Sequence, residues 1–426
     1  MNHRKNTAFL AACLIFCLHI PLWAADFHDI YGDFADYLNG IYGIDDNAGL
    51  TAFPILNIPM GGRSEGMASA FAAVSDDASF IEFNPAGSSM LTKSEIAFFH
   101  NNWIADSKME GLVYATRFGD FGLAAGAKWL YTPFTEYNIY AQRVSNGYFS
   151  EGAAILNVSY NFLSGYYFGG LSLGINLKGA FRIMPDYTMD DDIIAGGSGM
   201  SQSAVMGMAD VGILTRFNFL KAYSSREKNA SFALVIKNLG PPALGEPLPT
   251  VAGAALSYKP FRPLTLAFDY YMPLNIMDFE LSEKPYFAFG TSVNVTKFLS
   301  MRAGAMVKAG GSRVTVGSAL DLDKIAVDIN YTLDLLTQIQ PLNRVSVGMR
   351  LDLGDGGRQK KSDTVNELYL LGLDAFAQGN YTDAKYCWQE ALKMDPKFEP
   401  AKEGLNMLNS RQDLQERVED LFKLDF

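Results

Sequence analysis

Few side chains of this chain could carry out acid–base or metal chemistry. Beyond the first 24 residues there are two histidines, His28 and His100, and neither has the spacing that a Ser–His–acid triad or a metal site requires. Residues 190–192 are three consecutive aspartates that could bind a divalent cation, although an acidic run is usually a solvated face. The chain is therefore not expected to be an enzyme, and no cofactor or metal is expected.

The most distinctive stretch is residues 58–91, which is rich in Gly, Ala and Ser and ends in Asn84-Pro85-Ala86-Gly87. Proline donates no backbone hydrogen bond and pushes the residue before it out of the helical region, so this tetrapeptide predicts a fixed turn. A segment of small residues can also pack tightly inside a closed wall of strands. Taken alone, Asn84-Pro85 would be a plain turn.

The N-terminus predicts an export signal over residues 1–24. Arg4 and Lys5 precede an apolar run at 8–20, and Ala24 ends a passable cleavage site. The alternative is an N-terminal membrane anchor, for which the apolar run is too short.

The composition favours a membrane β-barrel. Hydrophobic residues make up 49% of the chain and the mean hydropathy is +0.03, with 39 Gly, 30 Phe and 21 Tyr. No later run of apolar residues is long enough for a membrane helix, whereas barrel strands alternate apolar and polar residues and so escape a window scan. The net charge of −11 disfavours nucleic acid as a partner.

Period-two alternation predicts long strands between residues 94 and 353. It is clearest over residues 171–183, 314–322, 325–333 and 345–353, where apolar residues oppose a polar, charged face. In a soluble sandwich the apolar face would be core, whereas in an outer-membrane barrel it would face lipid. Runs of about 10 to 13 residues match tilted membrane strands, and we expect about 14 of them.

The lengths of the predicted connections also alternate. Long ones are expected at 133–149, 185–202, 273–283 and 335–342, and short ones at positions such as 119–120 and 322–324, with 310–311 and 218–230 as exceptions. Short turns of such barrels lie in the periplasm and long loops outside.

Residues 61–91 carry a resemblance to the FadL family of outer-membrane long-chain fatty acid transporters. The shared pattern is a Gly-Arg opening, Gly-Met, an Ala-rich stretch, Asp-Asp-Ala and Asn-Pro-Ala-Gly. The segment most closely resembles the treponemal, spirochaete branch. The resemblance implies a 14-stranded barrel over residues 94–353 and an N-terminal hatch in its lumen over 25–93. It also implies passive import of hydrophobic molecules, with Asn84, Pro85 and Ala86 as hatch residues.

A fatty acid carboxylate would need a cationic partner in such a lumen. Candidates on polar strand faces are Arg182, Arg302, Arg313 and Arg350. The alternative is that each is paired with Asp or Glu, as arginines in wet barrel interiors usually are.

The composition changes after residue 353. Residues 354–362 predict a polar linker, Asp363 an N-cap, and 363–426 a helical domain with one tetratricopeptide-like repeat. With an even number of strands, this tail should be periplasmic, while outer-membrane lipid surrounds the barrel. The alternative function is a scaffold that recruits periplasmic proteins through residues 363–426.

Overall fold

The computed structural model describes residues 43, 45–103, 106–137, 140–183, 203–225, 227–335 and 343–424. The expected export signal, the three aspartates at 190–192 and most of the expected long loops at 185–202 and 335–342 lie outside these residues.

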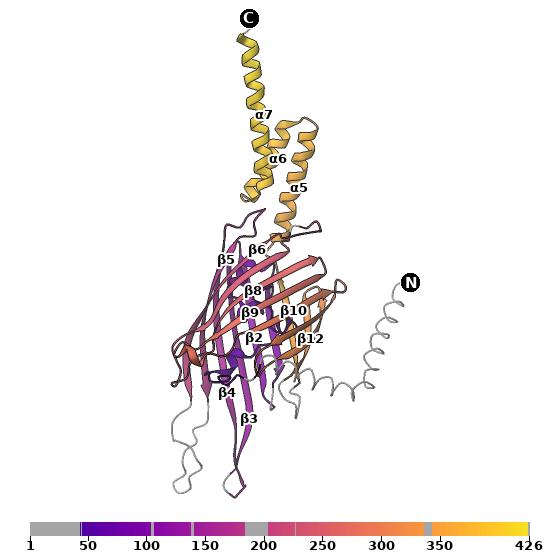
Figure 1. Ribbon diagram of the computed structural model, residues 1–426. Helices are drawn as coiled ribbons and strands as arrows, with labels where there is room; N and C mark the ends of the chain where they lie inside the picture. Colours follow the sequence, from indigo (N-terminus) through magenta and orange to yellow (C-terminus); the bar gives the residue numbers. More distant parts are fainter. Residues whose placement is uncertain are drawn as a thin grey trace, which may run out of the picture.

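Fourteen antiparallel strands of the described chain close into a barrel, as predicted (Figure 1). Each strand pairs with its neighbours in sequence, and β1 pairs with β14 to close the wall. The strands are β1 (Ser94–Asn102), β2 (Lys108–Phe118), β3 (Phe121–Tyr137), β4 (Arg143–Phe162), β5 (Leu171–Ile183), β6 (Ala204–Phe217), β7 (Ala230–Leu239), β8 (Thr250–Phe261), β9 (Leu264–Leu274), β10 (Tyr286–Asn294), β11 (Leu299–Val307), β12 (Arg313–Leu322), β13 (Ile325–Asp334) and β14 (Arg344–Gly354).

The two faces of the wall have the orientation expected of a membrane barrel. In β5, Ile175 and Leu177 point outward and are 51% and 63% exposed, whereas Asn176 between them is fully buried. This is the reverse of a soluble sheet, which buries its apolar face. The polar face of each strand therefore meets whatever fills the lumen.

The expected loop at 133–149 is wrong in extent. Strands β3 and β4 stay paired from Phe121–Tyr160 as far as Tyr137–Arg143, and the hairpin projects from the end of the barrel opposite the tail (Figure 1). Cross-strand contacts such as the edge contact between Tyr131 and Tyr148 stabilise the extension. A short helix, η4 (Phe279–Leu281), lies in the β9–β10 loop at 273–283.

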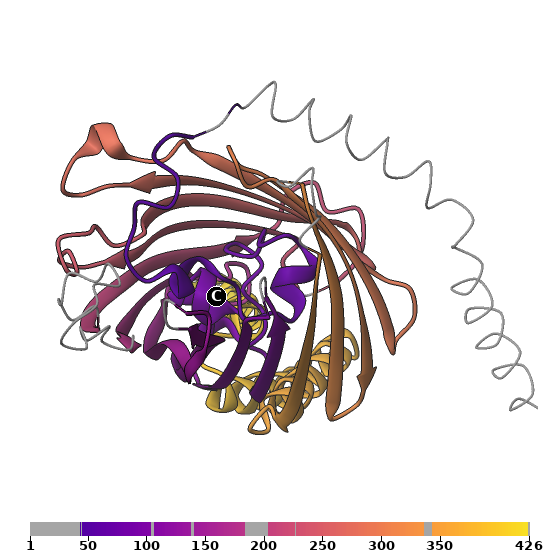
Figure 2. The same ribbon diagram turned by 90° about the horizontal axis from the view of Figure 1, so that it is seen from below.

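A plug formed by residues 45–91 fills the lumen (Figure 2). It consists of short helical turns joined by irregular backbone, and most of its side chains are buried. The turns are η2 (Pro54–Asn57), α3 (Arg63–Gly66), α4 (Phe80–Phe83) and η3 (Pro85–Met90). Small side chains, of which Ala68, Ala70 and Ala72 are fully buried examples, allow this packing.

Three helices form the tail: α5 (Arg358–Ala377), α6 (Tyr381–Met394) and α7 (Glu399–Leu424). Buried Trp388 lies at their crossing, where a Cβ on Gly372 would approach its indole nitrogen to 2.3 Å. No described helix has the length and apolarity needed to span a membrane.

The expected N-cap at Asp363 is wrong, because α5 begins at Arg358. The expected linker at 354–362 is shorter than predicted, since only residues 355–357 separate β14 from α5. The Asp355 carboxylate accepts hydrogen bonds from the backbone N–H groups of Gly357 and Gln359 at 2.9 and 2.6 Å. These bonds satisfy donors at the first turn, so the helix starts immediately after the barrel.

Candidate functional site

The Asn84-Pro85-Ala86 turn attaches the plug to the wall. The Asn84 carboxamide donates to the Ala72 carbonyl at 3.0 Å and to the Ile213 carbonyl of β6 at 3.1 Å, and it accepts from the Ala86 N–H at 3.0 Å. The side chain is fully buried. Asn84 therefore joins two parts of the plug to one wall strand.

Glycines in the wall permit this turn to approach closely. A Cβ on Gly174 of β5 would lie 2.2 Å from the Pro85 carbonyl oxygen, and one on Gly212 of β6 would lie 2.2 Å from the Asn84 carboxamide oxygen. Real Cβ atoms do not come this close to another heavy atom. Lumen-facing glycines in neighbouring strands thus form a seat for residues 84–86.

Carboxylates of the plug pair with cations of the wall. Glu82 lies 2.7 Å from Lys128, and Glu65 and Asp77 each lie 3.2 Å from Arg344 and Arg350, respectively. One carboxylate of the wall also binds the plug backbone. Asp269 of β9 accepts hydrogen bonds from the N–H groups of Phe71 and Ala72 at 3.0 and 2.9 Å. The plug is held by polar contacts on several sides of the lumen.

The four arginines expected to bind substrate lie at different points of the lumen. Arg302 and Arg350 come together on the Asp328 carboxylate, and Arg182 pairs with Glu151 at 2.7 Å nearer the other end. Arg313 donates to the Ser69 hydroxyl at 2.6 Å. Three of the four thus pair with a carboxylate of the protein, which is the alternative to binding a substrate carboxylate.

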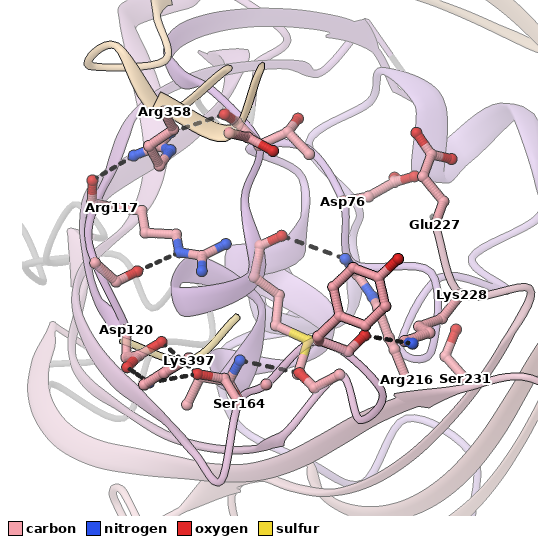
Figure 3. Close-up of a pocket in the computed structure, with 18 of the residues that line it drawn as sticks. Asp76, Arg117, Asp120, Ser164, Arg216, Glu227, Lys228, Ser231, Arg358 and Lys397 are labelled. Carbon is pink, nitrogen blue, oxygen red and sulfur yellow. Dashed lines mark hydrogen bonds and ion pairs between the residues drawn. The ribbon is translucent and has the colours of Figure 1, made fainter. Parts of the chain in front are cut away.

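A cavity of about 870 Å³, called the chamber here, lies at the end of the barrel that carries the tail (Figure 3). The plug, the strand ends and the tail all contribute to its lining. Nine basic and five acidic described side chains line it, so its balance is positive in a chain whose net charge is −11. The sequence did not predict the chamber, because its residues come from distant segments; the only signal was the position of Arg117 and Arg216 at the ends of their strands.

The tail forms part of the chamber lining by docking on the barrel turns. Lys397 pairs with Asp120 and donates to the Ser164 hydroxyl at 2.7 Å, while Glu399 accepts from the Tyr166 N–H at 2.6 Å. Tyr166 also packs edge-on against Phe398, with ring centroids 5.2 Å apart. The contact is small and largely polar.

Docking of the tail should weaken in acid. Burial raises the pKa of Asp120, but the hydrogen bonds from Lys397 and Ser164 outweigh it and hold this pKa below its ordinary value. The stabilisation of docking by ionised Asp120 is therefore complete above the ordinary aspartate pKa. It is lost as the pH falls through the lowered pKa of Asp120. Because the pair is partly exposed, we expect a loss of about 1 kcal/mol or less.

The measurement is the fluorescence anisotropy of a dye attached to Cys387 in α6, followed during acidification. Anisotropy should fall in acid for the native protein, and Asp120→Asn should lower it already at neutral pH. A titration that is the same in both proteins would contradict the role of Asp120.

Comparison with protein families gives a match over most of the chain. The Uncharacterised protein family (UPF0164) matches residues 43–356, which include the described plug and the whole barrel. The chain belongs to this family. A separate match to the tetratricopeptide repeat covers residues 365–398, which confirms the repeat expected in the tail.

Relatives of this chain in the UPF0164 family include treponemal proteins, as the resemblance predicted. A UPF0164 protein of Treponema pallidum (strain Nichols) is 30% identical over 376 residues, covering 85% of this chain and 83% of that protein. A second one from the same organism is 25% identical over 401 residues, covering 86% and 77%.

Solved structures similar to this chain include a hydrocarbon channel and a toluene transporter. The CymD monoaromatic hydrocarbon channel has a TM-score of 0.44 and 12% identity, covering 68% of this chain and 97% of CymD. The P. putida toluene transporter TodX has a TM-score of 0.39 and 12% identity, covering 64% and 92%. At these scores the likenesses add no support for the barrel fold, which is established by the strand pairing of this chain.

Proposed function

We propose that this protein is an outer-membrane transporter that passively imports long-chain fatty acids or similar hydrophobic molecules, with the plug as its gate. The observation that carries the proposal is a closed barrel whose lumen is filled by a separate segment seated on wall glycines.

The outer surface of the wall supports a membrane location. Its apolar side chains point away from the lumen, and large ones such as Leu156, Val316 and Ile329 are about half exposed or more. Burying such a surface in lipid removes it from water, and a closed barrel leaves no unpaired strand edge in the hydrocarbon.

The way the plug is held supports gating. The strands of the wall bond to one another around the whole circumference, whereas the plug contributes no strand to it. Its polar contacts are single hydrogen bonds and ion pairs, and each hydrogen bond contributes about 1 kcal/mol net. Its apolar side chains, such as Phe71 and Phe80, also pack against the wall. Rearranging the plug can nevertheless leave every strand pairing of the wall intact.

The test is binding of labelled palmitate to the refolded protein in detergent. We expect saturable binding that Asn84→Ala strengthens, because binding in the lumen requires the open plug and the substitution destabilises the closed one. Loss of the buried bonds of Asn84 costs about 1–3 kcal/mol, which corresponds to roughly 5- to 150-fold in apparent affinity.

Asn294→Ala is the matched control, since Asn294 is exposed at the end of β10 and should leave palmitate binding unchanged. Failure of a heat-modifiable, folded barrel to bind palmitate at all would sink the transport proposal. Binding that Asn84→Ala leaves unaltered would sink the gate.

A scaffold is the second candidate, and the docked tetratricopeptide repeat favours it. Leu370 and Leu371 of α5 are 62% and 52% exposed, so the tail presents an unburied apolar surface.

In either function the tail lies in the periplasm under this proposal. Protease added to intact cells should then leave residues 363–426 attached, and their release would place the tail outside.

A further inference from the structure

The chamber contains three arginines that form no ion pair with a described carboxylate. They are Arg117 at the end of β2, Arg216 at the end of β6 and Arg358 at the start of α5. Each donates to backbone carbonyl oxygens, at distances of 2.6 to 3.3 Å. The acceptors are Gly119 and Leu91 for Arg117, Met90, Val74 and Ser75 for Arg216, and Arg117 and Thr92 for Arg358. Carbonyl groups orient the guanidinium groups but do not neutralise their charge.

The acidic side chains of the chamber are mostly committed to other cations. Asp76 pairs with Arg63 at 2.6 Å, Asp77 with Arg350 at 3.2 Å, and Asp120 with Lys397. Asp395 accepts the backbone N–H of Lys397 at 3.0 Å. Asp76 and Glu227 act on Arg216 only through space. Asp120 acts in the same way on Arg117. None of the three arginines therefore has a described carboxylate in contact with it, and a bound anion would supply that contact.

The three side chains are arranged to meet one ligand. Arg117 and Arg216 extend into the chamber from opposite sides, with Arg358 beside Arg117 (Figure 3). Arg358 and Arg216 both act on Arg117 electrostatically, so like charges are held together at a partly buried position. An anion bound among them would relieve this repulsion and accept charge-assisted hydrogen bonds.

We propose that the chamber binds an anionic head group, a carboxylate or a phosphate, through Arg117, Arg216 and Arg358. Of the four lumen arginines described above, only Arg350 lines the chamber, where it is paired with Asp77 and Asp328. The tail completes the site by supplying Arg358. The proposal rests on the proposed transport function only for the route by which the ligand arrives. Val74 and Met90 of the plug line the chamber, so a molecule leaving the lumen past a displaced plug would enter there.

The first experiment uses the full-length protein in detergent micelles, with protein-free micelles subtracted. The probes are dodecanoate, dodecanol and inorganic phosphate, and binding is followed by calorimetry. Dodecanoate should bind at least about tenfold more tightly than dodecanol, and added salt should weaken only dodecanoate. Equal binding of dodecanoate and dodecanol would overturn the proposal, and this comparison needs no variant to fold.

Phosphate separates the two sources of the head group. If phosphate displaces dodecanoate, the site is open to free anions as well as amphiphiles. If it does not, the site requires the attached chain. Both results keep an anionic head-group site, and they assign its ligand.

The second experiment uses Arg117→Gln and Arg358→Gln, each checked for the gel mobility of a folded barrel. Each should weaken dodecanoate binding at least about tenfold and leave dodecanol unchanged. Lys297→Gln is the matched control, because it removes an exposed cation in the β10–β11 turn outside the chamber. Unchanged dodecanoate binding in both arginine variants would overturn the site. If these variants lose dodecanoate while Asn84→Ala leaves palmitate binding unaltered, the site stands and the gate fails.

Discussion

Gly174→Val should open the barrel. Any Cβ at this position of β5 would lie 2.2 Å from the Pro85 carbonyl oxygen and 2.4 Å from the Ala86 nitrogen, so the turn at residues 84–86 cannot keep its seat. Overpacking of this kind costs about 3 kcal/mol or more when backbone must move, which raises the open fraction roughly 100-fold. The wall itself is not obstructed, since valine suits a strand.

The measurement is the conductance of the protein in a planar lipid bilayer, together with the gel mobility that reports a folded barrel. Gly179→Val is the matched control, because Gly179 lies in the same strand, faces outward and has no heavy atom within 4 Å of the place that a Cβ would take. It should conduct like the native protein. A Gly174→Val barrel that is folded and as closed as the native one would refute the seat.

The second large effect is expected on stability. Asp328 of β13 is fully buried and serves both Arg302 and Arg350, and Arg350 in turn reaches Asp77 of the plug. Asp328→Asn removes the charge and leaves two guanidinium groups without this carboxylate. Breaking a buried ionic cluster in this way costs about 3–5 kcal/mol.

Urea unfolding in detergent, followed by gel mobility, measures this loss. Arg302→Met should lower the free energy of unfolding by less than Asp328→Asn does, because Arg350 still neutralises Asp328. Asp321→Asn, at an exposed position of β12, should change the free energy of unfolding by about 0.5 kcal/mol or less. If Asp328→Asn lowers the free energy of unfolding no more than Asp321→Asn does, the cluster does not stabilise the barrel.

The barrel could be predicted from the sequence because the alternation of apolar and polar residues along each strand identifies its two faces. Alternation over residues 171–183 and 325–333 reports which side chains meet lipid and which meet the lumen, and this depends only on neighbours in the chain. The extents of elements were harder to predict. The β3–β4 hairpin and the early start of α5 depend on cross-strand contacts and on Asp355, which a periodic pattern does not contain.

The partners of charged side chains could not be predicted. Arg302 and Arg313 look alike in sequence, yet one meets a carboxylate and the other a hydroxyl, because the plug has no periodic path through the lumen. The chamber depends on residues as distant as Arg63 and Lys397. A usable signal was present in the glycines: Gly174 and Gly212 occupy lumen-facing positions of adjacent strands, which indicates a close approach by another backbone.

The pairing of β1 with β14 also makes closure of the wall depend on the complete barrel sequence. The first strand of the wall begins three residues after the plug ends, and its closing partner is the last strand of the barrel, about 250 residues later. A chain that ended before β14 would leave β1 with an unpaired edge beside the segment that carries the plug. Enclosure of the plug therefore requires the whole wall, and a partial barrel would expose both a strand edge and the plug.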